Sequence, residues 1–124
     1  MMSQIIIAED NDELRRLIFK VLQASGHDVV QTRDGNECLR AVQLQEPDIV
    51  LTDLLMPETE GLELIMQLQR KLPRIRIIAM SGASNTKYLA VATTFGASAV
   101  LIKPFEMADL LTTIADVMGP AKAA

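Results

Sequence analysis

The sequence predicts an α/β fold in which a parallel sheet is covered by helices on both faces. Short apolar runs alternate with longer amphipathic segments along the 124 residues, so that five strands and five helices are expected. The strand-like runs are mainly apolar and do not alternate with polar residues, which is typical of strands buried on both faces of a sheet. The length suits one domain, because single domains most often hold roughly 100–150 residues.

The strands are predicted where β-branched and other apolar residues form short runs between polar ones. They cover residues 4–8, 28–32, 48–53, 75–80 and 99–102. Ser81 and Gly82 are expected to form a turn after the fourth strand, since both residue types are common in turns. Pro57 and Gly61 mark a loop after the third strand.

The first helix is predicted between Asp12, as its N-cap, and Gly26, which suits a left-handed terminus. Its apolar residues recur every three or four positions and form one inward face. This face is expected to hold Leu14, Leu17, Ile18, Val21 and Leu22. The same spacing predicts helices over 36–45, 62–72, 85–95 and 106–118. Their ends lie near Pro47, Pro73, Gly96 and Gly119.

Charge and cysteine content narrow the class of protein. A net charge of −4 argues against a nucleic-acid-binding domain, which usually carries a basic patch. Cys38 is the sole cysteine, which excludes an internal disulfide and suits a reducing compartment. No leader peptide or membrane-spanning run is evident, so we expect a cytoplasmic protein that binds no membrane. Cys38 is expected in the core, and His27 at a surface turn.

Polar residues follow the predicted strands, where an open parallel sheet binds its ligands. Glu9 and Asp10 follow the first strand, and Asp53 ends the third. Ser81 and Lys103 follow the fourth and fifth strands. Taken alone, Glu9 and Asp10 are explained equally well as acids that favour the positive end of the next helix. Together the five residues predict one site with three carboxylates, a hydroxyl and an ammonium group.

Three carboxylates at one edge repel one another, and a bound cation relieves the repulsion. Two unit charges about 4 Å apart cost roughly 1 kcal/mol in water and roughly 4 kcal/mol at an effective dielectric constant of 20. Oxygen ligands favour Mg²⁺, with Mn²⁺ as a substitute, over Zn²⁺. Lys103 and Ser81 are then placed to bind phosphoryl oxygens, and Asp53 to attack phosphorus.

These residues resemble the receiver domain of two-component response regulators, and the resemblance covers essentially the whole chain. It rests on Glu9-Asp10, on "DIVLTDLLMPETEG" around Asp53, on "MSG" at 80–82 and on "KPF" at 103–105. The four pieces are highly specific in this order and spacing. The resemblance implies a flavodoxin-like sheet with strand order 2-1-3-4-5. It also implies a single receiver domain over residues 1–124 without an effector domain.

The resemblance implies that Asp53 is the phosphoacceptor. Glu9 and Asp10 match the acidic pair that organises Mg²⁺, and Asp53 and the backbone carbonyl of Leu55 supply further metal ligands. Glu9 is a departure, because an aspartate is commoner at this position in the family. Its longer side chain still offers a carboxylate, so metal binding is expected to persist.

The phosphate-binding positions are carried over in the same way. Ser81 matches the hydroxyl switch residue, and Lys103 matches the lysine that contacts the phosphate. The Lys103–Pro104 bond is expected to be cis. Gly82 is small where the family needs phosphoryl access, and Gly61 matches the glycine of the loop after the acceptor.

A second departure concerns the output of the domain. Val100 stands where the family usually has the aromatic residue that turns inward after phosphorylation. Phosphorylation is therefore expected to survive better than the usual coupling to the surface.

Three functions follow from these patterns. The leading one is a stand-alone receiver that accepts a phosphoryl group on Asp53 from a histidine kinase or phosphotransfer protein and signals to a downstream protein. It is an enzyme only in promoting its own phosphorylation and dephosphorylation. The alternative, motivated by Val100, is an adaptor that works without phosphorylation. A flavodoxin-like electron carrier is disfavoured, because an acidic loop repels the FMN phosphate, and no Gly-x-Gly-x-x-Gly motif supports dinucleotide binding.

Overall fold

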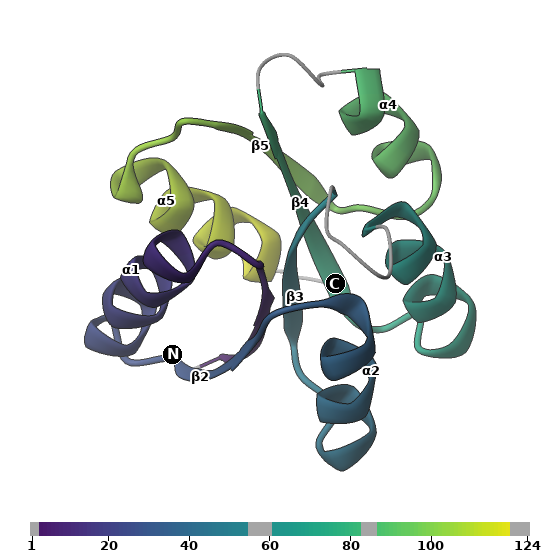
Figure 1. The fold of residues 1–124 in the computed structure, drawn as a ribbon, viewed down its shortest axis with the longest axis horizontal. Coiled ribbons are helices and arrows are strands. Elements are labelled where there is room, and N and C mark those ends of the chain that lie inside the picture. Colours follow the sequence, from purple (N-terminus) through teal and green to yellow (C-terminus); the bar gives the residue numbers. More distant parts are fainter. Residues whose placement is uncertain (1–2, 55–60, 83–86, 120–124) are drawn as a thin grey trace.

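The structure is a computed structural model that describes residues 3–54, 61–82 and 87–119. Within these residues, five strands alternate with five helices (Figure 1). In chain order they are β1 (Gln4–Ala8), α1 (Asp12–Ala24), β2 (Asp28–Thr32), α2 (Gly35–Leu44), β3 (Ile49–Asp53), α3 (Gly61–Lys71), β4 (Arg76–Gly82), α4 (Lys87–Thr94), β5 (Ala99–Lys103) and α5 (Met107–Met118).

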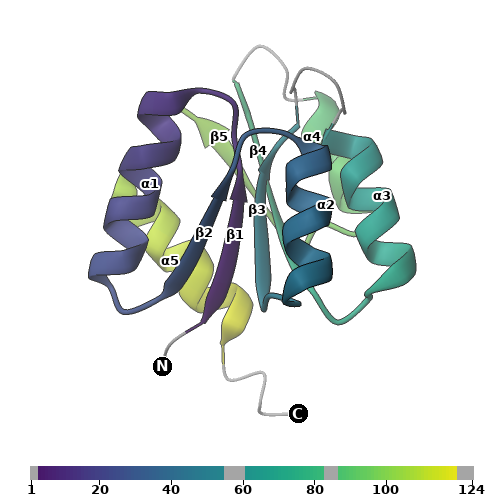
Figure 2. The ribbon, with the colours of Figure 1, turned by 60° about the horizontal axis from the view of Figure 1, so that its bottom comes forward.

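The strands form one parallel sheet in the order β2-β1-β3-β4-β5. Helices α1 and α5 cover one face of the sheet, and α2, α3 and α4 cover the other (Figure 2). This arrangement confirms the predicted fold class and the strand order that the resemblance implied. Among the described residues, no helix has the length and apolar character that crossing a bilayer requires.

The core forms two layers, one on each face of the sheet. In β1, Ile5 and Ile7 belong to the layer under α1 and α5, whereas Ile6 and Ala8 belong to the layer under α2, α3 and α4. All four are at most 3% exposed. Successive side chains of a strand point to opposite faces, so a strand with both faces covered needs apolar residues at every position. This explains why β1, β3 and β4 lack the alternation of a half-exposed sheet, whereas exposed and buried positions alternate in the edge strand β5.

The predicted turn at Ser81 and Gly82 is wrong. Both residues continue β4, where Ser81 pairs with Ile102 and Gly82 with Lys103 of β5. Pairing with the last strand extends β4 beyond the point at which its own apolar run ends. The bounds of β1 and β2 match the prediction, and the other element bounds differ from it by at most two residues, which is within the usual scatter for element ends. In the predicted helix over 85–95, residues 85 and 86 lie outside the described part of the chain.

The prediction for the start of α1 is also wrong. Asn11, not Asp12, is the N-cap, and its side-chain oxygen accepts a hydrogen bond of 2.9 Å from the Leu14 N–H. Asp12 instead lies in the first turn and forms an ion pair with Arg15. Leu17, predicted to face inward, is 47% exposed, whereas Arg15 is buried. The inward face of α1 therefore includes Arg15 in place of Leu17. The Arg15 side chain donates hydrogen bonds to Glu9 and Gln31, which lie outside the helix.

His27 lies between α1 and β2 and is half-buried. Its Nδ1 accepts a hydrogen bond of 3.2 Å from the backbone N–H of Ser3. It follows Gly26, whose φ of +96° confirms the predicted left-handed end of the first helix. His27 is thus the turn residue that the sequence predicted, with the additional role of joining the entry of β1 to the entry of β2.

The protein is expected to become less stable as the pH is lowered, and part of this loss is assigned to His27. Burial lowers the pKa of His27 below its ordinary value of 6.5, and a protonated Nδ1 cannot accept the Ser3 hydrogen bond. The unfolded chain then binds this proton more tightly than the folded one. The stability contributed by neutral His27 is therefore fully present above the unfolded-state pKa and is lost as pH falls through the lower, folded-state pKa. Urea midpoints between about pH 8 and about pH 5 measure the loss.

His27→Asn is the control for this pH dependence, since its side chain does not titrate. We expect the wild type to lose more stability than His27→Asn over the same range. Equal slopes for the two proteins would contradict the assignment, because His27 is the single histidine of the chain.

Candidate functional site

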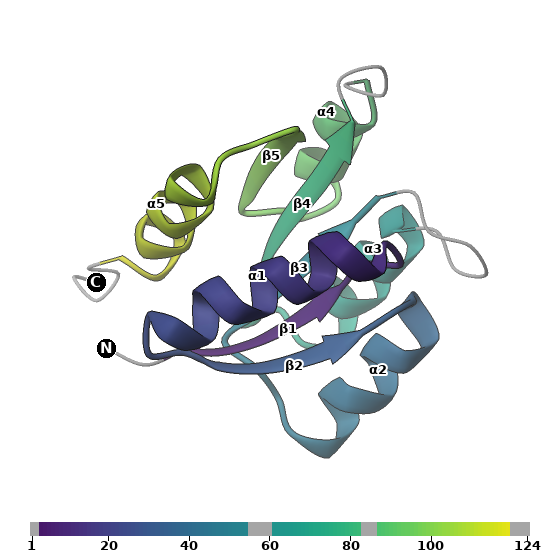
Figure 3. The same ribbon diagram turned by 60° about the vertical axis from the view of Figure 1, so that its left-hand side comes forward.

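The register of the sheet brings the predicted site residues to one edge. Asp53 of β3 is level with Met80 of β4, and Gly82 of β4 is level with Lys103 of β5. Glu9 directly follows Ala8 at the end of β1. Because the strands run in the same direction, their carboxyl ends meet at this edge (Figure 3).

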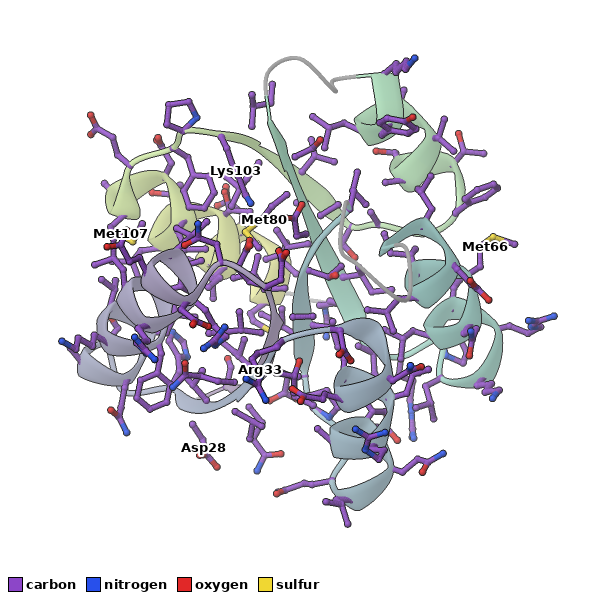
Figure 4. All side chains as sticks on the ribbon, in the orientation of Figure 1. Asp28, Arg33, Met66, Met80, Lys103 and Met107 are labelled. Carbon is purple, nitrogen blue, oxygen red and sulfur yellow. The ribbon has the colours of Figure 1, made fainter. Side chains whose placement is uncertain are left out.

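Three of these side chains lie on the same face of the sheet. Alternate side chains of a strand point to the same face, so Asp53 shares the face of Leu51 and Lys103 that of Leu101. Leu51 and Leu101 pack under α1 and α5. Glu9 continues the alternation of Ile5 and Ile7 onto the same face. Lys103 Nζ donates hydrogen bonds of 2.8 Å to Glu9 Oε1 and 2.9 Å to Asp53 Oδ2. Figure 4 shows the Lys103 side chain extending from β5 over the sheet. We refer to Glu9, Asp53 and Lys103 as the ionic triad.

The ionic triad is largely removed from water. Glu9 is 1% exposed and Asp53 7%, and the Lys103 side chain is 24% exposed. Burial raises the pKa of Glu9, and hydrogen bonds from Lys103 and the Asn11 N–H oppose this rise. Burial by itself lowers the pKa of Lys103, but the hydrogen bonds and charges of Glu9 and Asp53 outweigh it and raise the pKa above its ordinary value. Lys103 therefore stays protonated and offsets the charge of the two carboxylates.

Asp10 completes an acidic cluster with two members of the ionic triad. Glu9, Asp10 and Asp53 each present one carboxylate oxygen, and these oxygens lie within 4.8 Å of one another. Glu9 and Asp53 are buried and Asp10 is exposed, so the cluster opens to solvent on the side of Asp10. Hard oxygen ligands gathered in this way fit a divalent cation of the Mg²⁺ type. Leu55, whose carbonyl was predicted as a further ligand, lies outside the described residues.

The residues predicted to bind phosphate lie around this cluster. Ser81 is fully buried and lies one position past Met80, which pairs with Asp53. Its side chain points to the same face of β4 as those of Ile77 and Ala79, which pack under α2, α3 and α4. The structure therefore places Ser81 beside the site but on the other face of β4. The peptide bond between Lys103 and Pro104 is cis, as expected. A Cβ added to Gly82 would meet no described atom within 4 Å.

Gly61 lies close against the backbone at the end of β3. Its N–H donates a hydrogen bond of 2.9 Å to the carbonyl of Leu54, at the first turn of α3. A Cβ at this position would collide with the Asp53 carbonyl oxygen and would lie 2.5 Å from Leu54 Cα. These are backbone atoms, which cannot rotate away as a flexible side chain can. Gly61 thus lets α3 begin directly against the end of β3.

Gly61→Ala is expected to destabilise the protein by about 1–3 kcal/mol, the usual cost of overpacking. Relief of the collision has to displace either α3 or the strand end that carries Asp53. Gly82→Ala is the matched control, because its added Cβ meets no described atom within 4 Å. Urea denaturation measures both variants. Equal midpoints for Gly61→Ala and Gly82→Ala would show that the close approach is not required.

Sequence reasoning missed one buried charge near the site. Arg15 is 6% exposed, and its Nη1 donates a hydrogen bond of 3.1 Å to the backbone carbonyl of Glu9. The available signal was its position, since Arg15 precedes the buried Ile18 and Leu22 by three and seven residues on one helical face. A charged residue in that series indicates a partner beyond the helix.

A parallel sheet of this order, with carboxylates and a lysine at its carboxyl edge, defines a receiver domain. Residues 5–115 match the response regulator receiver domain family, and the chain belongs to this family. It is a receiver in phosphorelay signalling, a role also supported by relatives that are single-domain response regulators.

Two of these relatives are similar to the chain over nearly their whole length. The response regulator receiver protein CpdR of Brucella abortus is 31% identical over 118 residues, which is 91% of this chain and 94% of CpdR. The polar-differentiation response regulator DivK of Brucella ovis is 29% identical over 126 residues, 98% of this chain and 100% of DivK. Other relatives are much longer. The chain spans 17% of the CAI-1 autoinducer sensor kinase/phosphatase CqsS of Vibrio cholerae, at 34% identity over 90% of the chain.

Solved structures agree with the fold. NtrX of Brucella abortus has a TM-score of 0.94 at 23% identity, covering 99% of this chain and 28% of NtrX. The chemotaxis response regulator CheY4 of Vibrio cholerae has a TM-score of 0.88 at 24% identity, covering 94% of this chain and 99% of CheY4. At these identities the likeness concerns the fold alone.

Proposed function

We propose that the chain is a stand-alone receiver that takes a phosphoryl group on Asp53 from a histidine kinase or a histidine phosphotransfer protein. The phosphorylated domain then acts by binding a downstream protein. The observation that carries this proposal is the ionic triad, in which Lys103 Nζ lies 2.9 Å from Asp53 Oδ2 and 2.8 Å from Glu9 Oε1. An ammonium group held beside a buried carboxylate is suited to receive the negative charge that a phosphoryl group brings.

The chemistry assigned to the residues is aspartyl phosphorylation. A carboxylate oxygen of Asp53 attacks the phosphorus of the donor, the new O–P bond forms, and the P–N bond to the donor imidazole breaks with its electrons returning to nitrogen. Lys103 donates hydrogen bonds to the phosphoryl oxygens, and the Ser81 hydroxyl is assigned the same role after rearrangement. Glu9, Asp10 and Asp53 would hold Mg²⁺, which would offset the charge on the acceptor and phosphoryl oxygens. Mn²⁺ suits the same ligands.

The proposal also covers the extent of the domain, its cellular compartment and the kind of partner it binds. We assign residues 1–124 to a single receiver domain, since CpdR and DivK are similar to it over nearly their whole length. The protein is assigned to the cytoplasm, in agreement with its single, buried cysteine. It promotes only its own phosphorylation and dephosphorylation, and its partners are proteins, not nucleic acid or membrane.

Acetyl phosphate tests the proposal without requiring the partner kinase. The protein is incubated with acetyl phosphate and Mg²⁺, and the intact mass is then measured. We expect an increase equal to one phosphoryl group that is lost on acid treatment, as for an acyl phosphate. A parallel sample with EDTA is expected to show little product. Absence of the adduct in the presence of Mg²⁺ would overturn the proposal.

The adaptor that works without phosphorylation remains the second candidate, because of Val100. This residue is 37% exposed on β5 and its neighbour in the same exposed series, Ile102, is 48% exposed. An aliphatic side chain of this size cannot report phosphorylation by the inward turn of an aromatic ring. Beryllofluoride with Mg²⁺ mimics the phosphoryl group and separates the two functions. A receiver with phosphorylation-driven output shifts amide resonances in α4 and β5, whereas the adaptor shows changes confined to the site.

A further inference from the structure

Arg15 is a buried arginine whose guanidinium joins three segments beside the acidic cluster. Its side chain is 8% exposed. Nη1 donates to the Glu9 carbonyl at 3.1 Å, Nη2 contacts Asp12 Oδ1 at 2.7 Å, and Nε donates to Gln31 Oε1 at 3.2 Å. The partners lie after β1, in the first turn of α1 and in β2. A planar guanidinium offers five N–H donors in a rigid fork, whereas the lysine ammonium is a compact point charge on a flexible stem.

Two of these partners are the two ends of the turn between β1 and α1. Arg15 binds the backbone of Glu9 and the side chain of Asp12, and Asp10 lies between them. The turn is also held internally, because the Asn11 N–H donates a hydrogen bond of 3.0 Å to Glu9 Oε2. Glu9 and Asp10 are two of the three carboxylates assigned to the cation. The conformation of this turn therefore decides where two metal ligands point.

We propose that Arg15 is a positioning residue for the metal site, which it serves by holding the turn that carries Glu9 and Asp10. This inference rests on the proposed function, since it assumes that the acidic cluster binds Mg²⁺. Arg15 touches neither the cation nor the phosphoryl group in this role. It acts through the Glu9 carbonyl and the Asp12 carboxylate, in the way that residues behind metal ligands generally orient them.

Whether removal of Arg15 strengthens or weakens Mg²⁺ binding separates a positioning role from a purely electrostatic effect. Loss of a positive charge near a cation site strengthens cation binding, because one source of repulsion is removed. Loss of a residue that orients the ligands weakens it. Weaker Mg²⁺ binding after removal of Arg15 therefore has to come from the released turn. A role in stability alone changes the free energy of unfolding but leaves the Mg²⁺ affinity of the folded protein unchanged.

The experiment compares Arg15→Met and Arg15→Lys with the wild type, and uses Arg16→Met as the matched control. Arg16 is the exposed neighbour on the same helix turn. Isothermal titration of the folded proteins with Mg²⁺ gives the dissociation constants. We expect Arg15→Met to weaken Mg²⁺ binding about tenfold, the lower end of the usual effect for residues that orient metal ligands. Arg15→Lys should lie between Arg15→Met and the wild type, and Arg16→Met should match the wild type.

A second readout is the Mg²⁺ dependence of phosphorylation by acetyl phosphate. For Arg15→Met, the Mg²⁺ concentration at half-maximal rate should rise while the rate at saturating Mg²⁺ stays near that of the wild type. A folded Arg15→Met that binds Mg²⁺ as tightly as the wild type, or more tightly, overturns the inference. If Arg15→Met does not fold, Arg15→Lys decides, and a dissociation constant equal to that of the wild type overturns it.

Mg²⁺ binding and phosphorylation of the wild type show whether a negative result concerns Arg15 alone or the proposed function as a whole. If the wild type neither binds Mg²⁺ nor accepts a phosphoryl group, the proposed function fails and this inference fails with it. If the wild type does both and the Arg15 variants bind Mg²⁺ equally well, the proposed function stands and only the role of Arg15 is overturned.

Discussion

Asp53→Asn is expected to abolish phosphorylation by acetyl phosphate and Mg²⁺. The amide has nearly the shape of the carboxylate but is a poor nucleophile and carries no charge for the cation. Asp53 is 7% exposed and accepts a hydrogen bond from Lys103. Because asparagine has nearly the same shape, the substitution removes the acceptor without opening a cavity. Intact mass after incubation measures the result. An acid-labile adduct on Asp53→Asn would mean that another residue is the acceptor.

The same variant is expected to lose most of its stabilisation by Mg²⁺. A ligand that binds only the folded state stabilises it by about 2.7 kcal/mol at a concentration of 100 times its dissociation constant. Asp53 supplies one of the three oxygens of the acidic cluster, and a neutral amide is a weaker ligand. Thermal unfolding with and without Mg²⁺ measures the difference. Asp116→Asn, at an exposed position of α5, is the control and should keep the Mg²⁺ response of the wild type.

Lys103→Met is expected to destabilise the protein in EDTA by about 2–3 kcal/mol. Methionine keeps much of the apolar stem but removes the ammonium group that bridges Glu9 and Asp53. Both carboxylate side chains are at most 10% exposed, so water replaces the lost partner only in part. Removing one member of a fully buried pair usually costs about 3–5 kcal/mol, and the partial exposure of Lys103 reduces this figure.

Mg²⁺ is expected to restore part of the stability of Lys103→Met, because a cation then offsets the two carboxylates. Urea denaturation in EDTA and in Mg²⁺ measures both effects. Lys20→Met is the control, since Lys20 is exposed on α1 and lies outside the site. Lys103→Met and Lys20→Met with equal midpoints in EDTA would contradict the importance of the ionic triad for stability.

The sequence predicted the features that depend on local patterns. Residues 5–8 of the first strand are uniformly apolar, and the structure buries them in two layers on opposite faces. The polar residues that follow the strands lie at one edge, because all strands of a parallel sheet end on the same side. The receiver family was identified by motifs in these strand ends, and the family comparison confirms it.

Other features escaped the sequence because they depend on distances between segments that pattern alone does not specify. Nothing local distinguishes Asn11 from Asp12 as the N-cap, since both residue types are good caps. The role of Arg15 depends on the Glu9 carbonyl and on Gln31 of a neighbouring strand. The fit of Gly61 depends on the backbone of Asp53, which α3 approaches only after folding.

By itself, then, the sequence determined which elements form, which residues lie at the carboxyl edge and which family the chain resembles. Periodicity and strand-end chemistry are local properties and can be read along the chain. Only the tertiary structure decided that Lys103 binds Glu9 and Asp53, which precede it by 94 and 50 residues. The physical reason is that strand register and side-chain parity, set by the packing of the whole sheet, bring these three charges onto one face within hydrogen-bond distance.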